Sequence, residues 1–362
     1  MIAIIGGGPG GLTLARVLHV HGVDAVVYER DASRAARPQG GMLDLHADSG
    51  QLAIHAAGLD GPFLAAARRE GQDMYMYDHT GKRLLEEITP DDAPMLRPEI
   101  DRADLRDLLL DSLPDDAVAW GRAFQRAEPR PGGGHVLHFA DGGTEECALL
   151  VGADGANSRV RPLLSDARPA YSGVYAVDGT ITDPGPDALA LVGRGNLFAI
   201  GSDQTLGAQR NGDGTIRVGL VRRAPQPGPD AADLATVLGH LAGWDPRFAA
   251  LVESCDAPLV LRPVNVLPIG RTWDHRADVT LLGDAAHLMP PMGLGANLAM
   301  LDAADLAAAI AANPGDVGVA LTAYEPAMTD RAAKAARFTA DVQDMMIAPD
   351  GAEATLRFFT GG

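Results

Sequence analysis

A glycine-rich stretch near the N-terminus has the residue types and spacing to hold phosphates. It reads IIGGGPGGLTLARVL over residues 4–18. The spacing Gly6-x-Gly8-x-x-Gly11, with Pro9 and Gly10 inside it, permits a tight turn, close approach of the backbone to a pyrophosphate and close packing of a helix on a strand. An apolar, strand-like run precedes the glycines and a helical pattern follows them. We therefore expect phosphates to meet free N–H groups at a helix N-terminus.

Glu29 ends the next strand-like run, DAVVYE, 18 residues after Gly11. An acidic residue at about this distance accepts the ribose hydroxyls of an adenosine. Together, the glycine turn and Glu29 predict an adenine dinucleotide site. These two features alone leave NAD and FAD open.

Two later turns each place an acid directly after an apolar run. LLVGADG leads to Asp154 and Gly155, and VTLLGDAAH leads to Asp284. Both acids would lie at the carboxyl ends of strands, where open α/β sheets bind their ligands. Residues 295–297, at the helix start after a Pro/Gly loop, can present N–H groups and a positive dipole end to an electron-rich ring edge.

No residue stands out as a dedicated acid or base, and we assign no catalytic residue. His287 is read as a structural hydrogen-bond donor, because a histidine in such a turn more often has that role. The sequence has no metal-ligand spacing and no G-x-S-x-G nucleophile turn, so we expect no metal. Cys147 and Cys255 are read as inert thiols.

The elements that position these residues differ in pattern along the chain. Residues 166–265 hold short alternating stretches broken by Gly, Asn and Asp, which is typical of an antiparallel sheet. Residues 296–313 and 317–342 have helical periodicity, and Pro326 should kink the second helix or mark its start.

Composition sets further limits. The chain has 362 residues, 46% of them hydrophobic, which is enough for two folded domains of ordinary size. Its net charge of −18 argues against binding to nucleic acid. No apolar run approaches the ~20 residues of a membrane span, and a strand at residue 1 leaves no room for a signal peptide. We expect a cytoplasmic monomer.

The ordered trio GGGPGG with Glu29-Arg30, GADGANSRVR and GDAAHLMPPMGLGAN resembles the three fingerprints of the class A flavoprotein monooxygenases, the para-hydroxybenzoate hydroxylase fold. RPQGGMLDLHADSGQLAIHAAGL, RPEIDRADLRDLLLDSLP and YEPAMTDRAAKAARFTADVQDMM further resemble the tetracycline-inactivating monooxygenases, and the likeness runs almost end to end.

The resemblance implies an α/β fold. A Rossmann-like FAD-binding domain of the glutathione reductase type 2 class would be interleaved with a mainly antiparallel β-sheet substrate domain and followed by a long C-terminal helix. The implied FAD domain comprises residues 1–72, 98–165 and 264–315. The substrate domain comprises 73–97 and 166–263, and the bridging helix comprises 316–362.

The resemblance also implies roles for individual residues. Glu29 and Arg30 would hold the adenosine, and Arg37 and Asp44 would contact NADPH or the flavin. Arg102 would contact FAD, whereas Arg106 can equally be an exposed helix charge. Asp154 and Gly155 belong to the motif associated with both FAD and NADPH. The remaining cofactor contacts would be Asp284 and the loop after it, namely Pro291, Gly293, Gly295, Ala296 and Asn297.

The implied substrate contacts are less closely matched. The polar residues that hold tetracycline in the resembled enzymes have no identical counterparts here, and the corresponding places fall near Asp178, Asn196 and Arg217. The loop between His287 and Asn297 is one residue shorter and reads Gly-Leu-Gly where Gly-Gln-Gly is usual. Met292 in this loop is our candidate for an apolar pocket lining.

The implied activity is an NADPH- and O2-dependent hydroxylation through a flavin C4a-hydroperoxide. Its substrate would be a bulky, electron-rich phenol or enol, polycyclic or polyketide-like, in antibiotic inactivation or natural-product tailoring. Two alternatives stay open: an FAD-dependent dehydrogenase or reductase on the same fold, and a non-catalytic flavin- or drug-binding protein.

Overall fold

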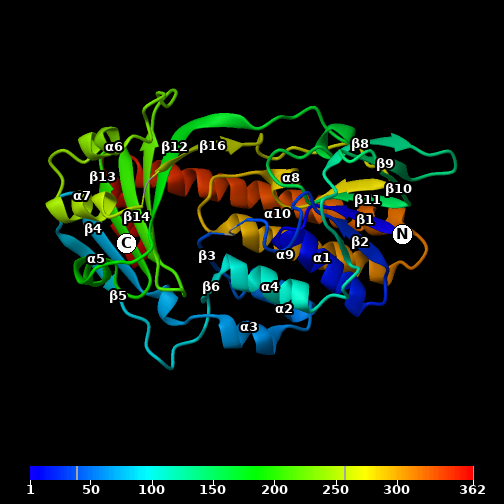
Figure 1. Ribbon diagram of the computed structural model, residues 1–362, viewed down its shortest axis with the longest axis horizontal. Helices are drawn as coiled ribbons and strands as arrows, with labels where there is room; N and C mark the ends of the chain where they lie inside the picture. The colour runs from blue at the N-terminus through cyan, green and yellow to red at the C-terminus, as the bar shows by residue number, and fades with distance from the viewer. Residues whose placement is uncertain (38–39, 257, 362) are drawn as a thin grey trace.

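A computed structural model describes residues 1–37, 40–256 and 258–361. Two large sheets lie at opposite ends of the elongated molecule, and a long helix runs along it between them (Figure 1). The expected architecture is confirmed: a dinucleotide-binding α/β half, a mainly antiparallel sheet and a long helix near the C-terminus. The residue bounds expected for the domains stay a prediction.

The first sheet is parallel and holds the glycine turn. Short apolar runs pair in register, with Ile2 beside both Leu149 and Ala25. Buried on both faces, such runs suit a parallel sheet. In spatial order its strands are β17 (Val279–Leu281), β11 (Leu149–Gly152), β1 (Ile2–Ile5), β2 (Ala25–Tyr28) and β7 (Val118–Ala119).

Helices and a small sheet cover this parallel sheet. The three-stranded antiparallel sheet packs through Phe139 against Tyr28, with ring centroids 4.9 Å apart. Its strands are β8 (Phe124–Pro129), β9 (His135–Phe139) and β10 (Thr144–Cys147), and the segment PRPGGGH forms the hairpin between β8 and β9. The helices of this half are α1 (Pro9–Val20), α2 (Gly50–Ala56), α3 (Asp60–Ala66), α4 (Arg102–Asp111), α8 (Asp284–His287) and α9 (Leu294–Ala312).

The second sheet has seven strands and two unlike faces. Its order is β16 (Val260–Val266), β12 (Ala170–Ile181), β15 (Ile216–Arg223), β14 (Gln204–Arg210), β13 (Asn196–Gly201), β4 (Met74–Asp78) and β5 (Arg83–Glu87). All neighbours are antiparallel except β13 and β4. The outer face is apolar and is covered by α5 (Pro186–Val192), α6 (Leu234–His240) and α7 (Pro246–Glu253).

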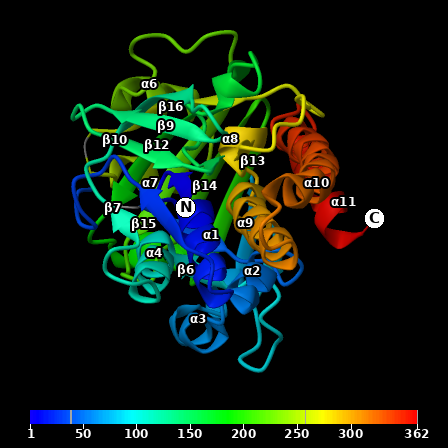
Figure 2. The same cartoon turned by 90° about the vertical axis from the view of Figure 1, so that its right-hand side faces the viewer.

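A small sheet and a long helix link the two halves. A two-stranded sheet, β3 (Met42–Asp44) with β6 (Glu99–Asp101), lies between them. Helix α10 (Val317–Met346) packs against α9, as Figure 2 shows, and reaches the seven-stranded sheet. Pro326 lies inside α10 and does not begin it. The expected single bridging helix over 316–362 is two helices, because the chain turns after Met346 and continues as α11 (Gly351–Thr360).

Helix α9 is the one helix in the described ranges that is long and apolar enough to cross a membrane by length and composition. Half of that apolar window is buried inside the protein, where α9 packs against α1, α2 and α10. This packing is typical of a core helix.

Candidate functional site

The glycine turn brings β1, α1 and the Asp154 turn into close contact. Gly6 has φ +109°, and a Cβ there would lie 2.4 Å from the carbonyl oxygen of Ala153. A Cβ on Gly11 would lie 2.0 Å from the carbonyl oxygen of Gly6. Glycine is therefore required at both positions. Gly8, the N-cap of α1, is different, because a Cβ there would meet nothing within 4 Å.

Glu29 is buried beside this turn. One of its carboxylate oxygens accepts the N–H of Gly7 at 2.6 Å, and the other accepts the N–H of Asp31 at 2.9 Å. The acid thus fixes the loop while each oxygen keeps a second lone pair for a ligand hydroxyl. Arg30 is exposed beside it, and Arg37 is ion-paired with Asp31 at 2.9 Å.

Arg161, which no sequence pattern marks as a site residue, joins the Asp154 turn to the Asp284 turn. The buried Arg161 guanidinium donates to the carbonyl oxygens of Ala285 and Ala156, both at 2.8 Å. Asp154 accepts the N–H of Arg159 at 2.7 Å through one carboxylate oxygen. Its other oxygen is buried and has no hydrogen-bond partner among the described residues. Burial raises the pKa of Asp154.

Asp284 and Arg102 come from distant segments and influence each other's charge. Burial raises the pKa of Asp284, and His287, Arg102 and Arg161 oppose the rise. Burial also lowers the pKa of Arg102, with repulsion from Arg217 adding to the fall and Asp284 opposing it. Both side chains nevertheless keep contact with solvent. Charged side chains that are largely enclosed by protein but still reach solvent, as these two are, are typical of a ligand-binding pocket.

The loop before α9 lies beside this acid and beside β3. A Cβ on Gly295 would lie 3.8 Å from a carboxylate oxygen of Asp284, and one on Gly293 would lie 3.4 Å from Asp44. Pro291 and Gly293 are exposed, and Ala296 is partly buried against the core of this half.

The Asn297 side chain makes its hydrogen bonds within the protein. Its amide nitrogen donates to the carbonyl oxygen of Asp44 at 2.7 Å, and its oxygen accepts the N–H of His46 at 2.8 Å. It also bonds Gly50 and Gly293. The side chain therefore ties α9 to the β3–α2 connection, and only the backbone at this position is left to face a ligand.

Arg106 is not an exposed helix charge. It is 3% exposed, donates to the carbonyl oxygen of Arg34 at 2.7 Å and lies over the ring of Trp120. The i, i+4 spacing from Arg102 suggested an exposed surface charge, but contacts with the distant 31–37 loop bury this side chain.

The inner face of the seven-stranded sheet faces this site. Arg217 of β15 lies against Gly40 and Gly41, just before β3, and contributes to the charge environment of Arg102. Asp178 of β12 pairs with Arg217 at 3.4 Å and with Arg262 at 2.6 Å. Asp178 and Arg217, two of the expected substrate residues, therefore lie on the face of the seven-stranded sheet that is turned toward Arg102.

Asn196, the third expected substrate residue, belongs to a hydrogen-bonded chain. Its amide donates to the carbonyl oxygen of Gly71 at 2.9 Å and to Glu99 at 3.3 Å, and its oxygen accepts from Gln209 at 2.8 Å. Glu99 is 5% exposed, and burial, then repulsion from Asp44, raises its pKa to about 8. No local pattern marks this buried acid, because the strands that enclose it are far apart in the chain.

Four partly exposed residues cross the middle of the same face in one row. Phe198 pairs with Gly207, Gly207 with Gly219, and Gly219 with Asp178. Directly paired residues share a face of the sheet. We call Phe198, Gly207, Gly219 and Asp178 the glycine row. Glycine inside a strand marks close approach of a ligand or another backbone, which is the signal that could have identified it.

Met292 also reaches this face. It packs in a cluster with Met76, Ile200 and Met346, which Phe198 also joins.

His287 is tied into a buried network. Its ring lies 2.5 Å from Asp302, which also accepts from Arg331 at 2.9 Å and from the N–H of Gly283 at 3.1 Å. Although burial opposes the charged form, Asp302 raises the pKa of His287. These contacts agree with a structural role.

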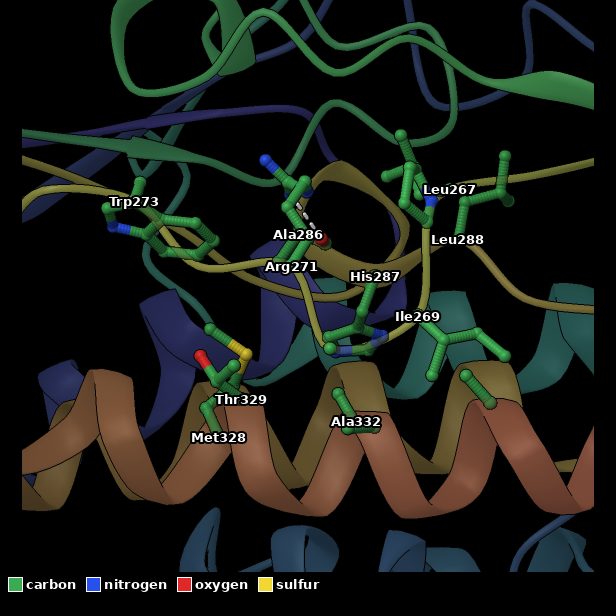
Figure 3. Close-up of a pocket in the computed structure, with 14 residues that line it drawn as sticks. Leu267, Ile269, Arg271, Trp273, Ala286, His287, Leu288, Met328, Thr329 and Ala332 are labelled. Atoms are coloured by element: carbon green, nitrogen blue, oxygen red, sulfur yellow. Dashed lines mark hydrogen bonds between the residues drawn. The ribbon is translucent and has the colours of Figure 1, made fainter.

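A small cavity lies behind His287, between residues 267–273, α8 and α10 (Figure 3). Its volume of about 20 Å³ suits one water molecule. It cannot hold an organic substrate. Among residues 1–37, 40–256 and 258–361 no group of three or more His, Cys, Asp or Glu side chains could hold a metal ion.

The residues present fit an adenine dinucleotide. Open space lies over Gly8 at the N-terminus of α1 and over Gly155. The unpartnered Asp154 oxygen and the accessible Asp284 are acceptors for ligand hydroxyls. Each of these features lies in one of the three glycine-containing turns.

Comparisons with known proteins agree with this geometry. A family model described as FAD binding domain matches residues 1–186 and 271–339. Monooxygenase asqM of Emericella nidulans is 33% identical over 84% of this chain and 82% of its own length. The 3-amino-4-hydroxybenzoate 2-monooxygenase of Streptomyces cremeus is 30% identical over 98% of this chain and 90% of its own.

Solved structures share the fold. Klebsiella pneumoniae HpxO, in complex with FAD and uric acid, has a TM-score of 0.83 at 24% identity, covering 100% of this chain and 92% of its own. The tetracycline destructase Tet(55) has a TM-score of 0.78 at 20% identity, covering 99% and 94%. At these identities the likeness concerns the fold alone.

Proposed function

The chain belongs to the FAD binding domain family and is an FAD-dependent monooxygenase, and on this premise we propose that it uses NADPH and O2 to hydroxylate a flat, electron-rich phenol or enol. The observation that carries the proposal is the position of the glycine row. This open strip of sheet lies on the same face as Arg217, whose side chain lies against Gly41, and the carbonyl oxygen of Gly41 accepts the N–H of Arg102. Arg102 in turn favours the charged form of Asp284. A substrate on the row would be next to the expected flavin site.

Each turn has a part in holding FAD. The N-terminus of α1, opened by Gly8, binds the pyrophosphate, and Glu29 holds the adenosine ribose beside Arg30. Asp154 and Asp284 accept hydroxyls of the cofactor, and Arg102 compensates negative charge. The backbone of residues 293–297 would meet the edge of the flavin ring. Bound FAD supplies the chemistry that activates dioxygen.

The protein's own contribution is to orient the substrate and exclude water. The inner face of the sheet offers an apolar side at Phe198 and Met292 and a charged side at Asp178 and Arg217. Such a surface can hold the ring of a phenol with its polar group at the charged side. Excluding water keeps the activated oxygen for transfer to the substrate.

The relatives support an aromatic substrate, since one of them is named for 3-amino-4-hydroxybenzoate. Tetracycline is a weaker candidate, because Asp178, Asn196 and Arg217 differ from the residues that hold it in the resembled enzymes. Removing matched polar partners rejects a substrate by large factors. We propose natural-product tailoring or antibiotic inactivation as the setting.

The test is an assay of the purified yellow protein against tetracyclines and polycyclic phenols. NADPH oxidation stimulated by a substrate, in step with a product heavier by one oxygen atom, is the expected result. Flavin reduction without an oxygenated product would instead indicate a reductase. Bound FAD without NADPH turnover would indicate a binding protein.

A further inference from the structure

Packing inside the protein does not explain Gly207. It lies in β14, the central strand of the seven, where glycine weakens a sheet. A Cβ there would lie no closer than 3.9 Å to any atom, an ordinary contact, and its φ is not in the left-handed region. Alanine would therefore fit. The missing side chain leaves space that no other residue of the described chain fills.

Gly219, opposite Gly207 on β15, extends this space. Both glycines are partly exposed although they lie in mid-sheet. The residues behind them on the other face are tightly buried: Ala208 is 1% and Leu220 1% exposed. The opening is thus on the inner face only.

Two side chains of different chemical character flank this opening. Phe198 is next to Gly207 on one side, and Asp178, held by Arg217 and Arg262, is next to Gly219 on the other. A carboxylate oxygen of Asp178 lies 3.1 Å from where a Cβ of Gly219 would be. The pair therefore makes a bare strip of backbone between an aromatic ring and an ion-paired group.

We propose that Gly207 and Gly219 are specificity-determining positions, which let the flat ring system of a hydroxyarene lie directly against the backbone of β14 and β15. This rests on the proposed function and deepens it. A flat ring can contact both peptide planes and the edge of Phe198 at once. A ring with a saturated, puckered half cannot approach the strip as closely.

The test compares Gly207→Ala with wild type, both loaded with FAD. Gly207→Ala is the cleaner variant, because Gly219→Ala would displace Asp178. The probes are β-naphthol and its ring-saturated tetrahydronaphthol analogue, which share the phenol and differ in flatness. Dissociation constants come from the change in flavin absorbance, without NADPH. Thermal unfolding and flavin content confirm that the variant is folded and loaded.

We expect wild type to bind β-naphthol more tightly than the saturated analogue. Gly207→Ala should weaken β-naphthol binding about tenfold, since one extra methyl group in a fitted site has this order of effect. Its melting temperature should not fall, because alanine restricts the unfolded chain more than glycine. Gly239→Ala, in the exposed part of α6 on the outer side of the sheet, is the matched control and should bind like wild type.

Equal β-naphthol affinity in wild type and Gly207→Ala would overturn the inference, as would absence of β-naphthol binding to wild type. A different outcome would contradict the proposed function. Binding that discriminates by flatness, with no oxygenated product when NADPH is added, would leave the glycine strip standing and remove the monooxygenation of this class of substrate.

Discussion

At the residue scale, Asp284 is the acid on which cofactor binding should depend most. It is enclosed by protein yet partly accessible, and the charges of His287, Arg102 and Arg161 favour its ionised form. Asp284→Ala should weaken FAD binding by roughly 10- to 100-fold, the equivalent of a hydrogen bond to a charged group. Titration of the apoprotein with FAD measures this. Asp305→Ala, on the exposed side of α9, should bind FAD normally; an unchanged FAD affinity in Asp284→Ala would remove Asp284 from the site.

Glu99 should give the protein a distinct pH dependence. Its pKa rises from an ordinary 4.5 to about 8, so the folded protein keeps a proton that the unfolded chain has released. Its contribution to stability is complete below pH 4.5 and is lost as the pH rises through about 8. The slope between these values is about 1.4 kcal/mol per pH unit.

Glu99→Gln removes that slope. Relative to wild type, the variant should gain about 2 kcal/mol of unfolding free energy between pH 6 and pH 8. Urea denaturation of both proteins at the two pH values gives the difference, in which the other titrating groups cancel. Parallel pH profiles for the two proteins would show that Glu99 is already ionised in the folded state.

At the level of secondary structure, two glycines of the glycine turn have different roles: Gly10 allows close helix packing and Gly8 leaves room for a ligand. A Cβ on Gly10 would lie 2.8 Å from Leu282 and 3.0 Å from the carbonyl oxygen of Ala299, which shows how closely α1 and α9 pack. Gly10→Ala should therefore cost ~1–3 kcal/mol of stability. Gly8→Ala meets no protein atom, so it should keep its stability and lose about tenfold in FAD affinity, because only a ligand would contact the methyl group.

Denaturant unfolding of the apoproteins and FAD titration distinguish the two glycines. FAD binding like wild type by Gly8→Ala, or wild-type stability of Gly10→Ala, would contradict these roles of the two glycines.

Local patterns predicted the elements well. The strand–glycine–helix order at residues 2–20, the antiparallel texture after residue 166 and the two late helices are confirmed, because each depends on nearby residues. The features that could not be predicted depend on pairing between strands that are far apart in the chain. Glu99 becomes a buried acid, and Gly207 meets Gly219, only when separate strands adopt their register. The place of Asn297 beside the flavin stays a prediction; the hydrogen bonds of its side chain to Asp44 and His46 depend on the position of β3, which the sequence does not show.

At the scale of the whole molecule, α10 holds the two halves together. Glu325 accepts from Trp273, His275 and Thr280 at the parallel-sheet end. At the other end the hydroxyl of Thr205 donates to the carbonyl oxygen of Met346 at 2.7 Å. Helix α10 is therefore anchored at both sheets. Such anchoring suits an enzyme whose cofactor and substrate are held by different sheets.

In the proposed function, oxygen from O2 enters an aromatic substrate held between these sheets. The most direct measurement is the mass of the product formed by the FAD-loaded protein with NADPH, a polycyclic phenol and isotopically heavy dioxygen in ordinary water. We expect one heavy oxygen atom in each product molecule, in step with the NADPH consumed. A product whose new oxygen comes from water, or NADPH consumption that yields only hydrogen peroxide with every phenol tested, would contradict it.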